Sequence, residues 1–235
     1  MKTIAVFLLL IFAVMPQAHA PAGSDAVPAK YMADAAEQLT GRRAHMTNEI
    51  HLLAGKGLAG PAVTLRIVRD ESASRTTEGY AAIKVIEDAP AGSVLVEALD
   101  DEKDFAVFGA TLAVLAKSRG LAGFVGDGAV RNMAGLKRVE FPVFARGAVP
   151  GSAAGHYKIA GVNVPVWCGG IEVMPGDYVV ADDDGVAVAP KERYAEVLAS
   201  AKKMQDEDQA LLPLIEKYGS FTKAWQELHP TKQQP

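Results

Sequence analysis

The sequence predicts a mixed α/β fold in a single compact domain. Short apolar runs with strand character alternate with stretches whose apolar residues recur at helical spacing. An Asp-Gly pair within residues 182–185 lies between two apolar runs, which indicates an antiparallel hairpin. We find no internal repeat, no second domain and no regular strand–helix–strand alternation, so the sequence favours a mixed sheet over a wholly parallel one.

The first twenty residues have the features of a signal peptide. Lys2 is followed by an apolar run over 4–14, which is too short to span a bilayer, and residues 18–20 offer small side chains for cleavage. A retained membrane anchor is the alternative, but no cluster of charges follows the run. We therefore expect residues 1–20 to be removed and the mature protein to be periplasmic or secreted, free of the membrane.

The composition limits the classes of partner. The net charge is −4 at pH 7, so no basic surface for nucleic acid is expected. Cys168 is the only cysteine, which excludes an intrachain disulfide. Its neighbours are apolar, and this setting is typical of a buried structural thiol rather than of a nucleophile.

The N-terminal half is expected to alternate between loops and regular elements. Residues 21–30 are rich in Pro, Ala and Gly and are predicted to be a disordered lead-in. The following segments are predicted in order: a helix over 31–39, a loop over 40–60, a strand over 62–68, a loop over 72–77, a short helix over 79–87 and a strand over 93–99.

The second half begins with a helix and ends with one. A helix is predicted from Gly109 to Gly120 and a buried strand over 121–125. Short strands follow at 162–166, 170–173, 178–181 and 186–189, and a long amphipathic helix begins at Pro190. Pro213 is expected to end or kink that helix. We therefore divide the chain into a main domain over 31–212 and a C-terminal helical extension over 213–235.

A candidate anion pocket lies between Gly109 and Arg131. Glycine at the mouth of a helix leaves backbone N–H groups free at the positive end of the helix dipole. The run 126–128, Gly-Asp-Gly, follows the buried strand, and Arg131 is expected in the loop after it. An arginine offers a planar fork that matches a carboxylate, so the sequence suggests a pocket for a small carboxylic acid.

Five motifs resemble a known family. They are Gly-Pro-Ala-Val-Thr (60–64), Phe-Gly-Ala-Thr-Leu-Ala (108–113), Asp-Gly-Ala-Val-Arg (127–131), Phe-Pro-Val-Phe-Ala-Arg-Gly (141–147) and the segment 175–186. They are similar to the family that contains 4-hydroxy-4-methyl-2-oxoglutarate aldolases, related oxaloacetate decarboxylases and RraA-type regulators of ribonuclease E. The resemblance runs from about residue 31 to residue 209. It implies a swivelling β/β/α-type fold and a homotrimer or a dimer of trimers.

The resemblance also assigns a substrate site. In the family's aldolases, pyruvate binds along the backbone from the helix-opening glycine to the leucine three residues later, which here are Gly109, Ala110, Thr111 and Leu112. The family's substrate arginine corresponds to Arg131, the candidate catalytic residue. The alternative is that Arg131 pairs with Asp127 or with a neighbouring protomer.

The metal side of the family's site is changed in this chain. The family's aspartate that holds a divalent metal, Mg or Mn, corresponds to Asn132. Two further positions that are usually acidic are Ala110 and Gly135. Asp127 is a candidate for metal or proton handling, and a role in stabilising a turn is the alternative. The run 182–184 resembles a metal cluster, but an Asp-Gly turn explains it.

Two classes of function remain open. The first is a metal-assisted lyase that releases pyruvate from a 2-oxo acid, of the aldolase or oxaloacetate decarboxylase type. The second is a non-catalytic relative that binds a carboxylate or a protein after losing the metal ligand. The resemblance favours the first and the change at Asn132 favours the second. Regulation of a cytoplasmic ribonuclease is disfavoured by the predicted export.

Overall fold

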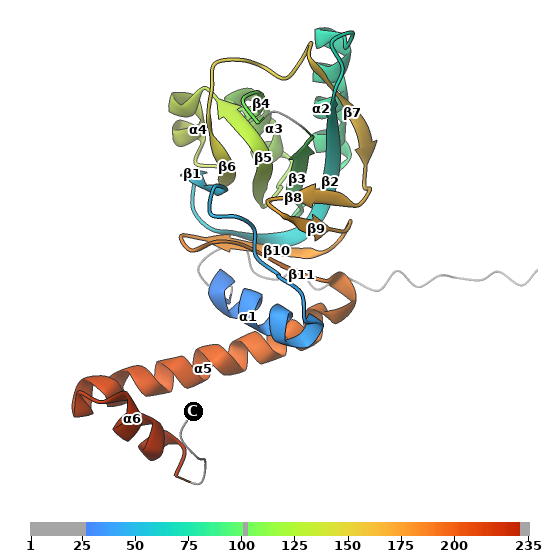
Figure 1. The fold of residues 1–235 in the computed structure, drawn as a ribbon. Helices are drawn as coiled ribbons and strands as arrows, with labels where there is room; N and C mark the ends of the chain where they lie inside the picture. The colour runs from blue at the N-terminus through green and yellow to red at the C-terminus, as the bar shows by residue number, and fades with distance from the viewer. Residues whose placement is uncertain (1–26, 101–102, 231–235) are drawn as a thin grey trace, which may run out of the picture.

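The computed structural model describes residues 27–100 and 103–230. The predicted signal peptide and most of the predicted lead-in therefore lie outside the described residues. The fold is α/β, as expected, and is built on one strongly curved sheet with helices on its outside and at its C-terminal end (Figure 1). None of the described helices has both the length and the apolar character needed to cross a membrane.

The nine-stranded sheet has the order β1-β6-β5-β3-β2-β10-β11, with β4 paired to β5 and β7 paired to β2. Its strands are β1 (His51–Ala54), β2 (Leu58–Arg69), β3 (Val94–Leu99), β4 (Ala106–Gly109), β5 (Gly123–Arg131), β6 (Val143–Ala148), β7 (Tyr157–Val162), β10 (Tyr178–Asp182) and β11 (Gly185–Ala189). A separate two-stranded sheet consists of β8 (Val166–Cys168) and β9 (Ile171–Val173).

Four neighbouring strands, β2, β3, β5 and β6, run parallel and are joined by helices. These helices are α2 (Arg75–Asp88), α3 (Ala110–Ser118) and α4 (Met133–Val139). The expectation of no regular strand–helix–strand alternation is therefore wrong. It failed because α2 buries only Ile86 completely and α4 spans two turns, so neither shows a strong apolar period.

Strand β5 is longer than predicted and contains Arg131 as its last residue. The Gly-Asp-Gly run was expected to follow the strand, but both glycines lie inside it. Glycine is needed at these two positions because a larger side chain would collide with its neighbours. A Cβ at Gly126 would lie 2.6 Å from the ring of Phe124, and one at Gly128 would lie 3.1 Å from Leu99. Glycine in this strand thus allows close packing rather than a turn.

The first helix, α1 (Ala29–Thr40), begins two residues earlier than predicted. Val27 and Ala29 are buried in an apolar cluster that α1 shares with β10, β11 and the start of α5. The predicted disordered lead-in over 21–30 is therefore too long at its C-terminal end, because apolar burial orders the chain from Val27 onward. The predicted loop over 40–60 likewise contains strand β1.

The predicted hairpin at 178–189 is confirmed, with Asp182 opposite Gly185 in the β10–β11 pair. Asp182 is structural, because its carboxylate accepts hydrogen bonds from Ala29 N at 2.8 Å and from Asp184 N at 3.0 Å. Cys168 is fully buried, as predicted, and burial raises the pKa of its thiol.

Pro213 was predicted to end or kink the long C-terminal helix, and the first of these alternatives is wrong. After a 3₁₀ turn (Lys191–Arg193), helix α5 (Tyr194–Tyr218) runs through Pro213 without ending there. Figure 1 shows α5 projecting away from the sheet, with α6 (Phe221–Leu228) folded back along it. Helix α5 is thus continuous across the predicted boundary between residues 212 and 213, and the division into a main domain and an extension stays a prediction.

Candidate functional site

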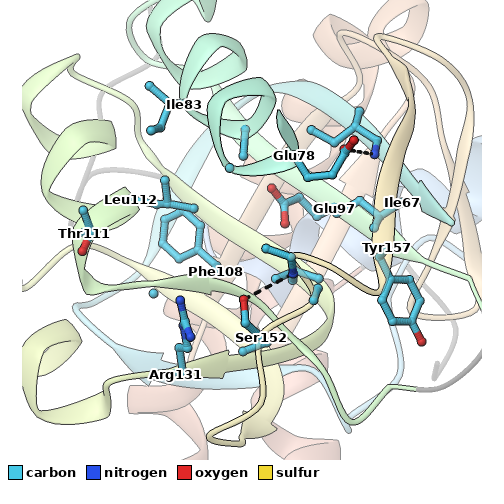
Figure 2. A pocket seen from close by; sticks show the side chains of 18 of the residues that line it. Ile67, Glu78, Ile83, Glu97, Phe108, Thr111, Leu112, Arg131, Ser152 and Tyr157 are labelled. Atoms are coloured by element: carbon cyan, nitrogen blue, oxygen red, sulfur yellow. Dashed lines mark hydrogen bonds between the residues drawn. The ribbon is translucent and has the colours of Figure 1, made fainter. Parts of the chain in front are cut away.

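A cavity of about 560 Å³ lies on the outer face of the parallel strands (Figure 2). Strands β3, β4, β5 and β7 supply part of its lining, and α2 and the first turn of α3 supply most of the rest. The segment 152–154 closes one side. All five residues predicted to bind substrate lie in this lining: Gly109, Ala110, Thr111, Leu112 and Arg131.

The sheet register places Gly109 directly opposite Arg131. These are paired residues at the ends of β4 and β5. A Cβ at Gly109 would lie 3.3 Å from the carbonyl oxygen of Arg131 and 3.4 Å from its Cγ. The glycine thus lets the stem of the arginine pass close to the mouth of α3. The predicted proximity is confirmed, while the role of Arg131 in binding a ligand stays a prediction.

Arg131 is available for a ligand. Within the described residues no carboxylate pairs with its guanidinium group, and the side chain is exposed at the cavity mouth and points inward (Figure 2). Gly109 caps α3 without a side-chain hydrogen bond, so the N–H groups of its first turn face the cavity without a capping side chain. A cation and a helix N-terminus at one end of a cavity suit a small anion.

Asn132 adopts the left-handed backbone conformation, with φ 58° and ψ 57°. Asparagine tolerates this conformation better than most residues. Its side-chain oxygen accepts a hydrogen bond from Gly135 N at 3.2 Å and caps helix α4. The residue lines the cavity, but the oxygen that a metal would use already has a structural partner.

The three positions that depart from the family pattern lie together. A Cβ at Gly135 would be 2.6 Å from the Cβ of Ala110 and 2.9 Å from both side-chain termini of Asn132. We call these three residues the neutral corner. It offers one neutral amide and no carboxylate, whereas magnesium usually takes one or two carboxylates. The residues of this chain therefore do not fit the expected Mg or Mn site, and the described residues contain no cluster of three metal-ligating side chains.

Asp127 does not line the cavity, and its suggested part in metal or proton handling stays a prediction. It is buried on β5, where one carboxylate oxygen accepts from Arg146 Nε. The other oxygen accepts from Gly169 N at 3.2 Å and lies 3.4 Å from Lys103 Nζ. Both oxygens of Asp127 thus have partners within the protein, and these contacts connect β5 with β6 and with the residue after β8.

Sequence reasoning missed Glu97, which lies in the middle of β3 and lines the cavity. Only 2% of the residue is exposed, and its Oε2 has no hydrogen-bond partner among the described residues. Burial raises the pKa of the Glu97 carboxyl to about 8. The one sequence feature that could have indicated Glu97 is its position as a single acid in an otherwise apolar strand, Val-Leu-Val-Glu-Ala-Leu at 94–99.

Comparison with known families gives a match to RraA-like, Aldolase/RraA, over residues 29–188. A Halalkalibacterium halodurans protein with the provisional name 4-hydroxy-4-methyl-2-oxoglutarate aldolase is 35% identical over 185 residues, which is 78% of this chain and 82% of the relative. A 4-hydroxy-4-methyl-2-oxoglutarate aldolase of Thermus thermophilus is 36% identical over 133 residues, which is 57% of this chain and 76% of the relative.

Solved structures agree with this match. A protein from Pseudomonas syringae pv. tomato superposes with a TM-score of 0.76 at 26% identity, covering 86% of this chain and 90% of that one. Streptomyces coelicolor RraAS2, described as an unusual member of the RNase ES inhibitor RraA family, gives 0.68 at 28% identity, covering 78% and 90%. All of helices α5 and α6 lie beyond the matched residues 29–188. This chain belongs to the RraA-like, Aldolase/RraA family.

Proposed function

We propose that this protein binds a small 2-oxo carboxylate in the cavity and acts as a carbon–carbon lyase that releases pyruvate. The substrate class is a 4-hydroxy-2-oxo acid, as in the aldolase named among its relatives, with oxaloacetate as a second candidate. One observation carries the proposal. Arg131, without a carboxylate partner among the described residues, lies opposite Gly109 at the uncapped N-terminus of α3.

Different groups of the cavity bind different parts of the substrate. The guanidinium fork of Arg131 binds the substrate carboxylate, and the N–H groups of Ala110, Thr111 and Leu112 receive the charge that develops on the keto oxygen. Cleavage of the bond between C3 and C4 leaves a pyruvate enolate, so donors aimed at that oxygen favour the transition state.

A divalent metal would add Lewis-acid stabilisation of the same oxygen. The neutral corner supplies no carboxylate to hold it, and we derive no step through a metal. Pyruvate release should therefore be measured with magnesium, with manganese and with chelator, using a coupled lactate dehydrogenase assay. 4-Hydroxy-4-methyl-2-oxoglutarate and oxaloacetate are the two substrates to compare.

Titration calorimetry with oxalate and pyruvate tests the binding site directly. Hydrogen bonds to charged groups contribute about 1.5–3 kcal/mol each, so Arg131→Ala should weaken oxalate binding by at least about tenfold. Arg131→Lys should restore little, because lysine lacks the fork. Arg138→Ala, on the exposed face of α4, is the matched control and should bind as wild type does. Equal oxalate affinity in wild type and Arg131→Ala would refute the proposed site.

A second candidate function is a carboxylate-binding protein without lyase activity. The observation that favours it is the neutral corner, where Ala110, Asn132 and Gly135 replace three positions that are usually acidic. Oxalate binding that depends on Arg131, together with no pyruvate release under any metal condition, would select this candidate over the lyase.

We also propose a homotrimer or a dimer of trimers, and export of the mature chain. Family resemblance supports the assembly, and Lys2 with the apolar run over 4–14 supports export. Light scattering of the mature protein checks the first, and a monomer at micromolar concentration would contradict it. Mass spectrometry of protein recovered from the periplasm and the medium checks the second.

A further inference from the structure

The cavity holds a buried acid that the proposed binding scheme does not use. Glu97 projects from β3 into the cavity between Glu78 and Phe108 (Figure 2). The other five side chains of β3 are apolar and buried, so strand pairing and core packing fix the position of Glu97. The carboxyl group is thus held on a rigid element in the lining of the cavity, and its Oε2 is buried without a hydrogen-bond partner among the described residues.

Two other charged side chains of the cavity lining, Glu78 and Lys158, already have other partners. Glu78, on α2, accepts a hydrogen bond from Ile159 N at 2.9 Å. Lys158, on β7, forms an ion pair with Asp70 at 2.8 Å. Neither the acid nor the base therefore neutralises Glu97.

The neighbouring strands supply no compensating charge either. Arg131, at the end of β5, is exposed at the cavity mouth. Asp127, also on β5, is held by Arg146 and Lys103. On the other side of β3 the Cys168 thiol donates only to the backbone oxygen of Glu97, at 3.8 Å.

A buried carboxyl group without a cationic partner keeps its proton, because charging it would require solvation that the site does not provide. The pKa of about 8 follows from that burial. At neutral pH most of Glu97 is therefore the carboxylic acid, and it faces the cavity with a proton to give. A carboxyl group tuned toward neutrality in this way is suited to general acid–base catalysis.

We propose that Glu97 is the catalytic residue that protonates C3 of the pyruvate enolate in this cavity. The inference rests on the proposed function. In this step the enolate electron pair forms a new C–H bond at C3 while the O–H bond of Glu97 breaks, and the keto group of pyruvate is restored. The Glu97 carboxylate then regains a proton from water.

The reverse step can be observed without carbon–carbon cleavage. The Glu97 carboxylate removes a proton from the methyl group of bound pyruvate, and deuterium from D₂O replaces it. Loss of the pyruvate methyl signal in proton NMR reports this exchange. Glu97→Gln should slow the exchange at least about a hundredfold, in line with the usual contribution of a general acid–base group.

Two further variants separate proton transfer from packing. Glu97→Asp keeps the titrating group but draws it back by one methylene, so exchange should be reduced yet measurable. Glu172→Gln, on the exposed side of β9 and outside the cavity, is the matched control and should exchange as wild type does. Oxalate affinity of Glu97→Gln should stay within about threefold of wild type at pH 7, because a neutral amide replaces a neutral acid.

The pH profile gives a signature that a structural role would not produce. Exchange needs the carboxylate, so its rate should rise as pH increases through about 8. Release of pyruvate from a 4-hydroxy-2-oxo acid needs the acid form and should fall over the same range. Both features should be absent in Glu97→Gln.

The outcomes keep the two proposals apart. Wild type that binds neither oxalate nor pyruvate refutes the proposed function. Wild type that binds pyruvate without methyl exchange, or Glu97→Gln that exchanges at the wild-type rate, overturns the role of Glu97 and leaves the binding site standing. If Glu97→Gln does not fold by circular dichroism, Glu97→Asp and the wild-type pH profile decide the question.

Discussion

Two buried acids lie on neighbouring strands of the same sheet and have opposite surroundings. Asp127 on β5 has Arg146, Lys103 and the N–H of Gly169 around its two oxygens. Glu97 on β3 has an oxygen without any partner among the described residues and a cavity in front of it. In the sequence, Asp127 belongs to one of the family motifs, whereas Glu97 is a single acid in an otherwise apolar strand.

The difference teaches that partners, rather than sequence context, separate a structural acid from a reactive one. A carboxylate surrounded by cations and N–H donors gains from being charged and joins elements together. A buried carboxyl group without them holds a proton that it can exchange with a ligand. Asp127 is thus a link between β5, β6 and the residue after β8, whereas Glu97 is a candidate for chemistry.

The largest expected effect follows from removing the structural acid. Asp127→Ala leaves the partly buried Arg146 and the N–H of Gly169 without their carboxylate. Breaking a buried ion pair in this way costs about 3–5 kcal/mol. Urea unfolding should show a loss of about 3 kcal/mol, because Arg146 retains some contact with solvent. Asp183→Ala, in the exposed hairpin turn, is the control and should stay within about 0.5 kcal/mol of wild type.

The same substitution also tests the comparison. If Asp127→Ala folds and binds oxalate as wild type does, the structural role stands. A folded variant that has lost oxalate binding would instead place Asp127 in the ligand site and break the distinction between the two acids.

Elements with their own local signal were predictable from the sequence. The hairpin at 178–189 was found because Asp-Gly specifies its turn, and the mouth of α3 was found from Gly109. The sequence predicts too short a strand β5, because a glycine inside a strand cannot be distinguished in the sequence from a glycine in a turn. Only the ring of Phe124, brought against Gly126, shows that close packing is the reason.

The residues of the candidate site also differ in whether the sequence could predict them. The proximity of Gly109 and Arg131 could be expected from the family motifs, although Arg131 was placed in a loop rather than at a strand end. Glu97 could not be recognised, because its lack of a partner depends on α2 and β7. Glu78 and Lys158, on those elements, engage Ile159 and Asp70 instead. Such an absence is a property of the folded structure and leaves no local pattern.

The second prediction concerns the effect of Glu97 on how the free energy of unfolding depends on pH. Its pKa is raised from 4.5 to about 8 in the folded protein. Between these values the folded state keeps a proton that the unfolded chain has released, so the free energy of unfolding should fall as pH rises from about 4.5 to about 8. Glu97→Gln removes this dependence, so its stability relative to wild type should be clearly greater at pH 8 than at pH 5.

Urea midpoints of both proteins at pH 5 and pH 8 provide the measurement. The difference between the proteins should grow with pH, and Glu172→Gln should track wild type at both values. A difference that does not change with pH would show that Glu97 titrates normally, and the contrast with Asp127 would lose its physical basis.

The smallest effect is expected when a carboxylate is introduced into the neutral corner. Asn132→Asp keeps an oxygen that can accept from Gly135 N, and a negative charge there is favourable at the N-terminus of α4. The aspartate also supplies the carboxylate that magnesium or manganese prefers. Manganese binding should tighten by about tenfold, within the range known for single changes around metal sites.

The double variant Asn132→Asp with Ala110→Glu should exceed the single one, because Ala110 lies against Gly135 in the same corner. Manganese titration followed by electron paramagnetic resonance measures binding, and the coupled assay with oxaloacetate measures pyruvate release. Wild type that already binds manganese as tightly as the variants would make Asn132 a working ligand despite its cap to α4. Variants that bind manganese without releasing pyruvate would favour the carboxylate-binding function, since the restored acid would then have completed a metal site but no catalyst.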